Sequence, residues 1–135
     1  MAKITKEKAT TMSLPVFRKV QDLCSLMVDV QNGMQKQYKH SIGDRMLSTC
    51  LDMLRRIFTI NRTDGVSDER LSEMRAFTDD FDYLRVLLRI SEEKRLLTLK
   101  QQASIALLTE NINAQMVGWK NKTEARHNNA ARSEP

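Results

Sequence analysis

Apolar side chains recur three and four positions apart through most of this chain, and that spacing limits what the chain can fold into. An α-helix has about 3.6 residues per turn, so this pattern places apolar side chains along one face of a helix. The clearest row belongs to a helix that begins near Pro15, a residue that a first turn tolerates because its missing N–H would have no partner there. The row consists of Val16, Phe17, Val20, Leu23, Cys24, Met27, Val30 and Met34.

A second helix is predicted over residues 44–62, after a polar linker at residues 35–44. Its apolar side chains form three rows and cover most of its circumference. One neighbouring helix cannot bury that much apolar surface, so we expect this helix to be either central in the fold or an oligomer contact. The rows are Leu47, Cys50, Leu54 and Ile57; Met46, Met53 and Ile60; and Leu51 and Phe58.

Two more helices follow the turn predicted at Asp64-Gly65. The third begins after Ser67, a good N-cap residue, and ends in the charged stretch SEEKR. The fourth begins after Thr98, because the side chains of Thr98 and Gln101 can form a capping box. The apolar rows are Met74, Phe77, Phe81, Leu84 and Leu88 in the third helix and Ile105, Leu108, Ile112 and Trp119 in the fourth.

The scarcity of turn-forming residues excludes most alternatives to a helical fold. Four Gly and two Pro in 135 residues supply too few turns for an all-β sandwich or barrel. Four helices of about 18–25 residues with short connections predict an up-down-up-down four-helix bundle. We expect one bundle domain at residues 13–122, flanked by disordered basic tails at residues 1–12 and 123–135, which lack apolar periodicity.

The sequence shows no signal for export or membrane insertion. No segment approaches the run of about 18 apolar residues that a membrane span requires, and the basic N-terminus lacks the apolar core of a signal peptide. We therefore expect a cytoplasmic protein without membrane contact. Cys24 and Cys50 lie on apolar rows, which predicts two small buried hydrophobic side chains rather than a disulfide or a zinc site.

Motifs for catalysis or cofactor binding are absent from the sequence. The two histidines, His40 and His127, lie off the apolar rows, so the ligand sets of di-iron and haem bundles are missing. No glycine-rich phosphate loop or nucleophile motif occurs. Asp79 and Asp80 flank the Phe77/Phe81 row, and Asp82 lies seven positions from both Arg75 and Arg89, so these three residues are best explained as a solvated, ion-paired face. We therefore expect a protein that is not an enzyme and holds no metal or cofactor.

Arginines stand in distinct rows on the second and third helices, which contain no lysine, within a chain of net charge +5. Arg85 and Arg89 are four positions apart and share one helix face among apolar residues, a mixture that is common in a protein interface, and the arginine side chain suits phosphate and carboxylate. The alternative is that the arginines pair with carboxylates on the bundle surface, namely Asp52, Asp79 and Asp82. The candidate binding residues are Arg85, Arg89, Arg55, Arg56 and Arg62, together with Lys120 and Lys122 beside Trp119. For Trp119 itself, the alternative role is to plug the end of the core.

Three segments carry a family resemblance: YKHSIGDRMLSTCLDMLRRIF over the linker and second helix, FDYLRVLLRIS in the third helix, and MVGWKNK near the end of the fourth. The order, length and chemistry of these segments resemble those of the accessory variability determinant (Avd) proteins of diversity-generating retroelements. The resemblance covers residues 16–122. Avd proteins are related to the S23-like four-helix proteins encoded by intervening sequences in bacterial large-subunit ribosomal RNA genes.

The resemblance implies a small basic four-helix bundle that assembles into a homopentameric ring and has no catalytic activity. It also implies binding to a reverse transcriptase and to template RNA or other nucleic acid, in support of mutagenic cDNA synthesis and retrohoming. The family's paired arginines fall on Arg85 and Arg89, and its basic C-terminal end falls on Lys120 and Lys122. The chain departs from the family in its longer tails and in the acidic residues Asp79, Asp80 and Asp82.

Two other functions stay open from the sequence. One is a free-standing RNA-binding bundle of the ribosomal intervening-sequence type, with no enzyme partner. The other is a purely structural helical scaffold. A reverse transcriptase gene beside this one would favour the accessory role, and a lack of salt-dependent nucleic-acid binding would favour the scaffold.

Overall fold

The computed structural model describes residues 10–63 and 67–133, which form helices and no strand. The long helices are α1 (Pro15–Asn32), α3 (Asp44–Arg62), α4 (Asp68–Glu93) and α5 (Leu99–Ser133). Shorter helical segments precede the first two, namely the 3₁₀ turn η1 (Thr11–Ser13), α2 (Lys36–Tyr38) and the π-helical η2 (Lys39–Gly43). No helix within the described ranges is long and apolar enough to cross a membrane.

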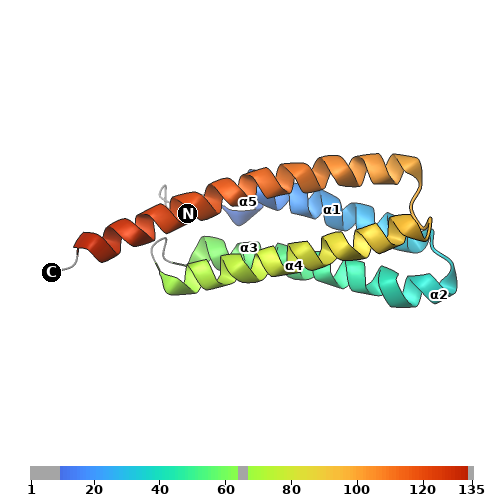
Figure 1. Ribbon diagram of the computed structural model, residues 1–135, viewed down its shortest axis with the longest axis horizontal. Coiled ribbons are helices and arrows are strands. Elements are labelled where there is room, and N and C mark those ends of the chain that lie inside the picture. Colours follow the sequence, from blue (N-terminus) through green and yellow to red (C-terminus); the bar gives the residue numbers. More distant parts are fainter. Residues whose placement is uncertain (1–9, 64–66, 134–135) are drawn as a thin grey trace, which may run out of the picture.

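Successive long helices run in opposite directions (Figure 1). Helix α3 packs against both α1 and α4, α1 packs against α5, and α4 contacts α5 to close the bundle. This arrangement confirms the predicted up-down-up-down four-helix bundle. The chain passes from α1 to α3 and from α4 to α5 at the same end of the bundle, on the right in Figure 1, which we call the connection end (residues 33–43 and 94–98).

The apolar row predicted for α1 lies at the centre of the core. All of its members are buried, and they belong to one cluster with buried side chains of the other three long helices. Cys24 and Cys50 are free, buried thiols, as predicted. The side-chain hydrogen bond that the Cys50 thiol makes with Cys24, together with burial, raises the pKa of the Cys50 thiol, so that thiol stays protonated and unreactive.

Helix α3 has two neighbours in the bundle, as each of the other long helices has, so it is not central in the fold. Both α1 and α4 pack against it, and its row through Met53 is buried, whereas Leu47 and Leu54 in the row through Cys50 are only partly buried. The third row stays outside, because Leu51 is 48% exposed and Phe58 is 37% exposed. The bundle therefore keeps an apolar strip on α3 that the other described helices cover only in part, since the Phe58 ring packs edge-to-face against Phe17 of α1.

The predicted polar linker at residues 35–44 is wrong, because this segment is helical from Lys36 onward and leads directly into α3. Gln31 of α1 holds it in place by donating a hydrogen bond to the carbonyl oxygen of Lys39 at 3.0 Å and by contacting Asp44. The widened π turn fits closely against α1 at Gly43, where a Cβ atom would lie 3.1 Å from the side chain of Gln31.

The two predicted disordered tails also need correction. Residues 1–9 lie outside the described part of the chain, but Thr11 is buried, and its hydroxyl accepts a hydrogen bond from Asn61 at 2.9 Å. At the other end, α5 continues through residues 123–133. Thr123 is buried and His127 Nε2 lies 2.5 Å from Asp68 Oδ1 of α4, so tertiary contacts anchor a segment whose own sequence lacks an apolar row.

The helix starts agree with the sequence signals. The Ser67 hydroxyl accepts a hydrogen bond from the backbone N–H of Arg70 at 3.1 Å, which makes Ser67 the N-cap of α4. At α5, the backbone N–H of Thr98 donates to Gln101 Oε1 and the N–H of Gln101 donates to the Thr98 hydroxyl, both at 3.0 Å. This is the predicted capping box. The predicted turn at Asp64-Gly65 lies outside the described residues.

Replacing Thr98 by Ala should lower the free energy of unfolding by about 1 kcal/mol, because the N–H of Gln101 loses its cap. Urea denaturation measures this change. The control is Ser104→Ala, which alters an exposed residue inside α5 and should change stability by less than about 0.5 kcal/mol. Equal losses in the two variants would show that the capping box does not stabilise the start of α5.

Candidate binding surface

Arg85 and Arg89 line a groove between α4 and α5, with a volume of about 230 Å³. Their spacing of one helical turn places both on the flank of α4 that faces α5. Leu88 and Ile105 form part of the same groove, so the aliphatic stems of the arginines lie beside apolar surface. We call Arg85, Arg89 and this groove the arginine groove.

The guanidinium groups of the arginine groove are not neutralised by carboxylates. Within the described residues, neither Arg85 nor Arg89 has a carboxylate oxygen within 4.0 Å, although Glu92 borders the groove. The guanidinium carbon of Arg85 lies 4.2 Å from the centroid of the Phe81 ring. A cation–π contact of this kind orients the guanidinium without cancelling its charge. The groove therefore presents two adjacent positive charges to an anion.

Arg56 has a structural role instead. Its Nε donates to Asp80 at 2.7 Å and its Nη1 to Glu73 at 3.3 Å, and all three side chains are roughly three-quarters buried. The hydrogen bond to Asp80 is the main cause of the raised pKa of Arg56. Arg56 thus joins α3 to α4, as the ion-pairing interpretation expects, although its partners differ from the predicted Asp79 and Asp82.

Arg55 and Arg62 are exposed on α3, whereas the arginine groove lies between α4 and α5. Arg55 pairs with Asp52 at 3.7 Å, and both side chains are more than half exposed, so this pair contributes little stability. The structure therefore does not gather all the candidate arginines into one surface.

Trp119 closes one end of the core, as the structural interpretation of this residue expects. Its ring is partly buried against the core cluster, and the guanidinium carbon of Arg70 lies 5.1 Å from the ring centroid. Lys122 lies at the edge of a neighbouring groove between α1 and α5, and Lys120 is only partly exposed.

Arg70 itself is a buried arginine that the sequence analysis missed. A signal was present, because Arg70 lies four positions before Met74 and so continues the apolar row of α4 toward its start. A charged residue at that position needs an aromatic or polar partner, and Trp119 supplies a ring.

The described residues contain no group of three His, Cys, Asp or Glu side chains that could hold a metal ion. His40 and His127 are far apart in the fold, His40 at the connection end and His127 beside Asp68 at the opposite end of α4. The arginine groove offers two cationic side chains, Arg85 and Arg89, beside the apolar side chains of Leu88 and Ile105.

Comparison with known proteins gives one finding. A family model described as bAvd-like matches residues 15–123, which includes all four long helices except the last part of α5. No curated protein and no solved structure matches the chain significantly.

The adjacent residues Arg55 and Arg56 provide a matched pair for testing the structural assignment. Arg56→Ala should lower the free energy of unfolding by about 1–2 kcal/mol, because Asp80 and Glu73 would lose their partner while partly buried. Arg55→Ala should change it by less than about 0.5 kcal/mol. Urea denaturation of both variants measures the difference. If both variants were equally stable, the Arg56 network would contribute nothing to the fold.

Proposed function

This chain belongs to the bAvd-like family, whose members are accessory, non-catalytic proteins of the retroelement kind, and on that basis we propose that it binds a reverse transcriptase and template RNA. In this role it would support the error-prone cDNA synthesis and retrohoming of a diversity-generating retroelement.

The arginine groove is the observation that supports the binding part of this proposal. Arg85 and Arg89 carry charges that no described carboxylate neutralises, whereas Arg55 and Arg56 have carboxylate partners. Guanidinium groups bind phosphate or carboxylate through paired hydrogen bonds, so the groove suits either an RNA backbone or an acidic surface of the polymerase.

The accessory role is proposed for an oligomer, and the exposed strip on α3 is its best candidate interface. Leu51 and Phe58 are exposed, and Leu47 and Leu54 beside them are only partly buried. A contiguous apolar strip of this kind is typical of a protein interface. A homopentameric ring would repeat the arginine groove around its circumference and so raise the avidity for a long polyanion.

Replacing Arg85 and Arg89 together by Ala should weaken binding to the reverse transcriptase or to RNA at least tenfold, or about 1.4 kcal/mol. Stability should fall by no more than about 1 kcal/mol, the value of one exposed cation–π contact. The measurement pairs thermal melting with capture of the neighbouring reverse transcriptase and with RNA binding over a range of salt concentrations.

The matched control for this pair is Arg18→Ala with Arg75→Ala, which removes the same charge from other exposed positions. If the variant that lacks Arg85 and Arg89 bound the reverse transcriptase and RNA normally, the binding site would not be the arginine groove. Arg55 and Arg62 would then be the next residues to test. RNA binding without capture of any reverse transcriptase would instead favour the free-standing RNA-binding function.

Light scattering should give a mass of about five times the 15.6 kDa of one chain. Leu51→Glu should dissociate this oligomer, because a carboxylate in an apolar contact loses its hydration. Leu107→Glu, at a 70% exposed position on α5, is the control and should leave the mass unchanged. A monomeric wild-type protein would contradict the oligomer, and dissociation by Leu107→Glu alone would place the interface on α5.

A further inference from the structure

The turn between α4 and α5 contains a strained arginine. Among the described residues, Arg95 is the only non-glycine residue with a positive φ, 56°. The backbone N–H of Leu96 donates to the carbonyl of Ser91 at 2.8 Å, and that of Arg95 donates to Glu92 at 3.0 Å. These two hydrogen bonds define a Schellman motif, in which the residue at the position of Arg95 is usually glycine. An arginine at this position makes the turn less stable than a glycine would.

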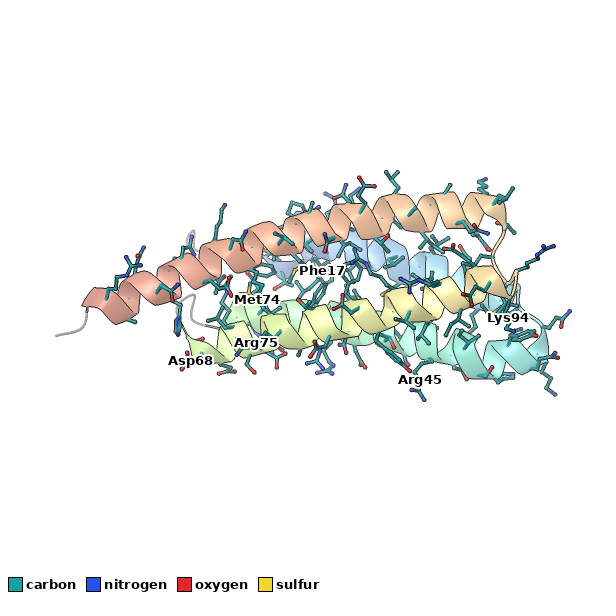
Figure 2. All side chains as sticks on the ribbon, viewed as in Figure 1. Phe17, Arg45, Asp68, Met74, Arg75 and Lys94 are labelled. Atoms are coloured by element: carbon teal, nitrogen blue, oxygen red, sulfur yellow. The ribbon has the colours of Figure 1, made fainter. Side chains whose placement is uncertain are left out.

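The strained turn borders a hollow at the connection end, with a volume of about 370 Å³. Lys94 and Arg95 line it on one side, and Gln35 and Tyr38 from the segment after α1 line it on the other. Figure 2 shows Lys94 at this end of the bundle, at the opposite end of α4 from Asp68. The hollow is therefore built where two connections meet, mainly from polar and cationic side chains.

Positive charge predominates around this hollow. Lys94 and Arg95 are both exposed, and neither has a carboxylate within ion-pair distance in the part of the chain that the structure describes. Cations outnumber carboxylates among the residues of this end. The cations are Lys36, Lys39, Lys94, Arg95 and Lys100, and the carboxylates are Asp44, Glu92 and Glu93.

We propose that the hollow at the connection end is a second binding site, in which Arg95 and Lys94 contact phosphate groups of a polynucleotide strand. The inference rests on the proposed function in that the strand would be the RNA named there. A planar guanidinium binds a phosphate through two hydrogen bonds, and two cations at one hollow, with further lysines at the same end of the bundle, suit a ligand with repeating charge better than a single carboxylate. The strained backbone of Arg95 is consistent with a residue kept for binding rather than for folding.

Because Arg95 occupies a strained turn, substitutions at this one position can test its effect on stability and its effect on RNA binding separately. Arg95→Gly relieves the turn and removes the charge, so it should raise Tm by about 3 °C while weakening RNA binding about three- to tenfold. Arg95→Lys keeps the strain and the charge but loses the paired hydrogen bonds, so it should leave Tm near the wild-type value and weaken RNA binding less than Arg95→Gly does. Lys94→Gln should weaken RNA binding without raising Tm.

The experiment measures fluorescence anisotropy of a labelled single-stranded RNA with the full chain at several salt concentrations, together with thermal melting. Loss of one phosphate contact should reduce the slope of log affinity against log salt by about 1. Arg75→Gln is the matched control, because it removes one exposed charge from α4 near Asp79 and Asp82, away from the connection end (Figure 2). It should bind RNA as the wild type does.

Any of five outcomes would overturn the site. Unchanged RNA binding by Arg95→Gly would reject it while leaving the proposed function intact. An equal loss in Arg75→Gln would show that only net charge matters, and a lower Tm in Arg95→Gly would make Arg95 a structural residue. Loss of reverse transcriptase capture without loss of RNA binding would assign the hollow to an acidic protein surface. A wild-type chain that binds no RNA would reject both this site and the RNA-binding half of the proposed function.

Discussion

Side chains of α1, α3 and α4 with almost no exposed surface, such as Leu23, Met53 and Phe77, meet in the middle of the bundle. Truncating one such side chain to alanine costs about 2–5 kcal/mol, a large part of the 5–15 kcal/mol that stabilises a typical domain. This packing fixes the rotation of each helix about its own axis. The direction in which every polar residue of these helices points follows from that rotation.

The same packing sorts the arginines into different roles. Arg70 continues the buried row of α4 and is therefore held beneath Trp119. Arg56 lies on the flank of α3 that faces α4, where Asp80 and Glu73 compensate its charge. Arg85 and Arg89 lie on the other flank of α4, where the described helices bring no carboxylate within ion-pair distance. Arginine therefore has three roles in this bundle: it is buried at the edge of the core, it forms ion pairs between two helices, and it lines an open groove.

Local signals in the sequence predicted the fold well because each of them acts over a single turn. The apolar row of α1, the cap at Ser67 and the capping box at Thr98 are all decided by residues three or four positions apart. The four-helix arrangement then follows from burying the rows against one another.

Features that depend on contacts between helices could not be predicted in this way. The segment at residues 36–43 is helical because Gln31 and the close fit at Gly43 hold it against α1. The end of α5 is helical where Thr123 and His127 reach the rest of the bundle. For the candidate site, the sequence placed Arg85 and Arg89 on one face, but the choice of Asp80 over its neighbours as partner of Arg56 depends on the rotation of α4.

The arginine groove and the hollow at the connection end are neighbours along one helix. At 1.5 Å per residue, α4 rises about 12 Å from Arg85 to its last residue, and Arg95 follows in the next turn. A polyanion that occupied the groove would therefore reach the hollow within a few phosphate spacings, and Glu92 is the acidic residue that borders the groove between them. In the proposed role, phosphate contacts at these two places would give affinity without base recognition, because phosphates carry no sequence information. In the proposed accessory role, a bundle that held a template strand along α4 would determine where that strand enters a polymerase bound beside it.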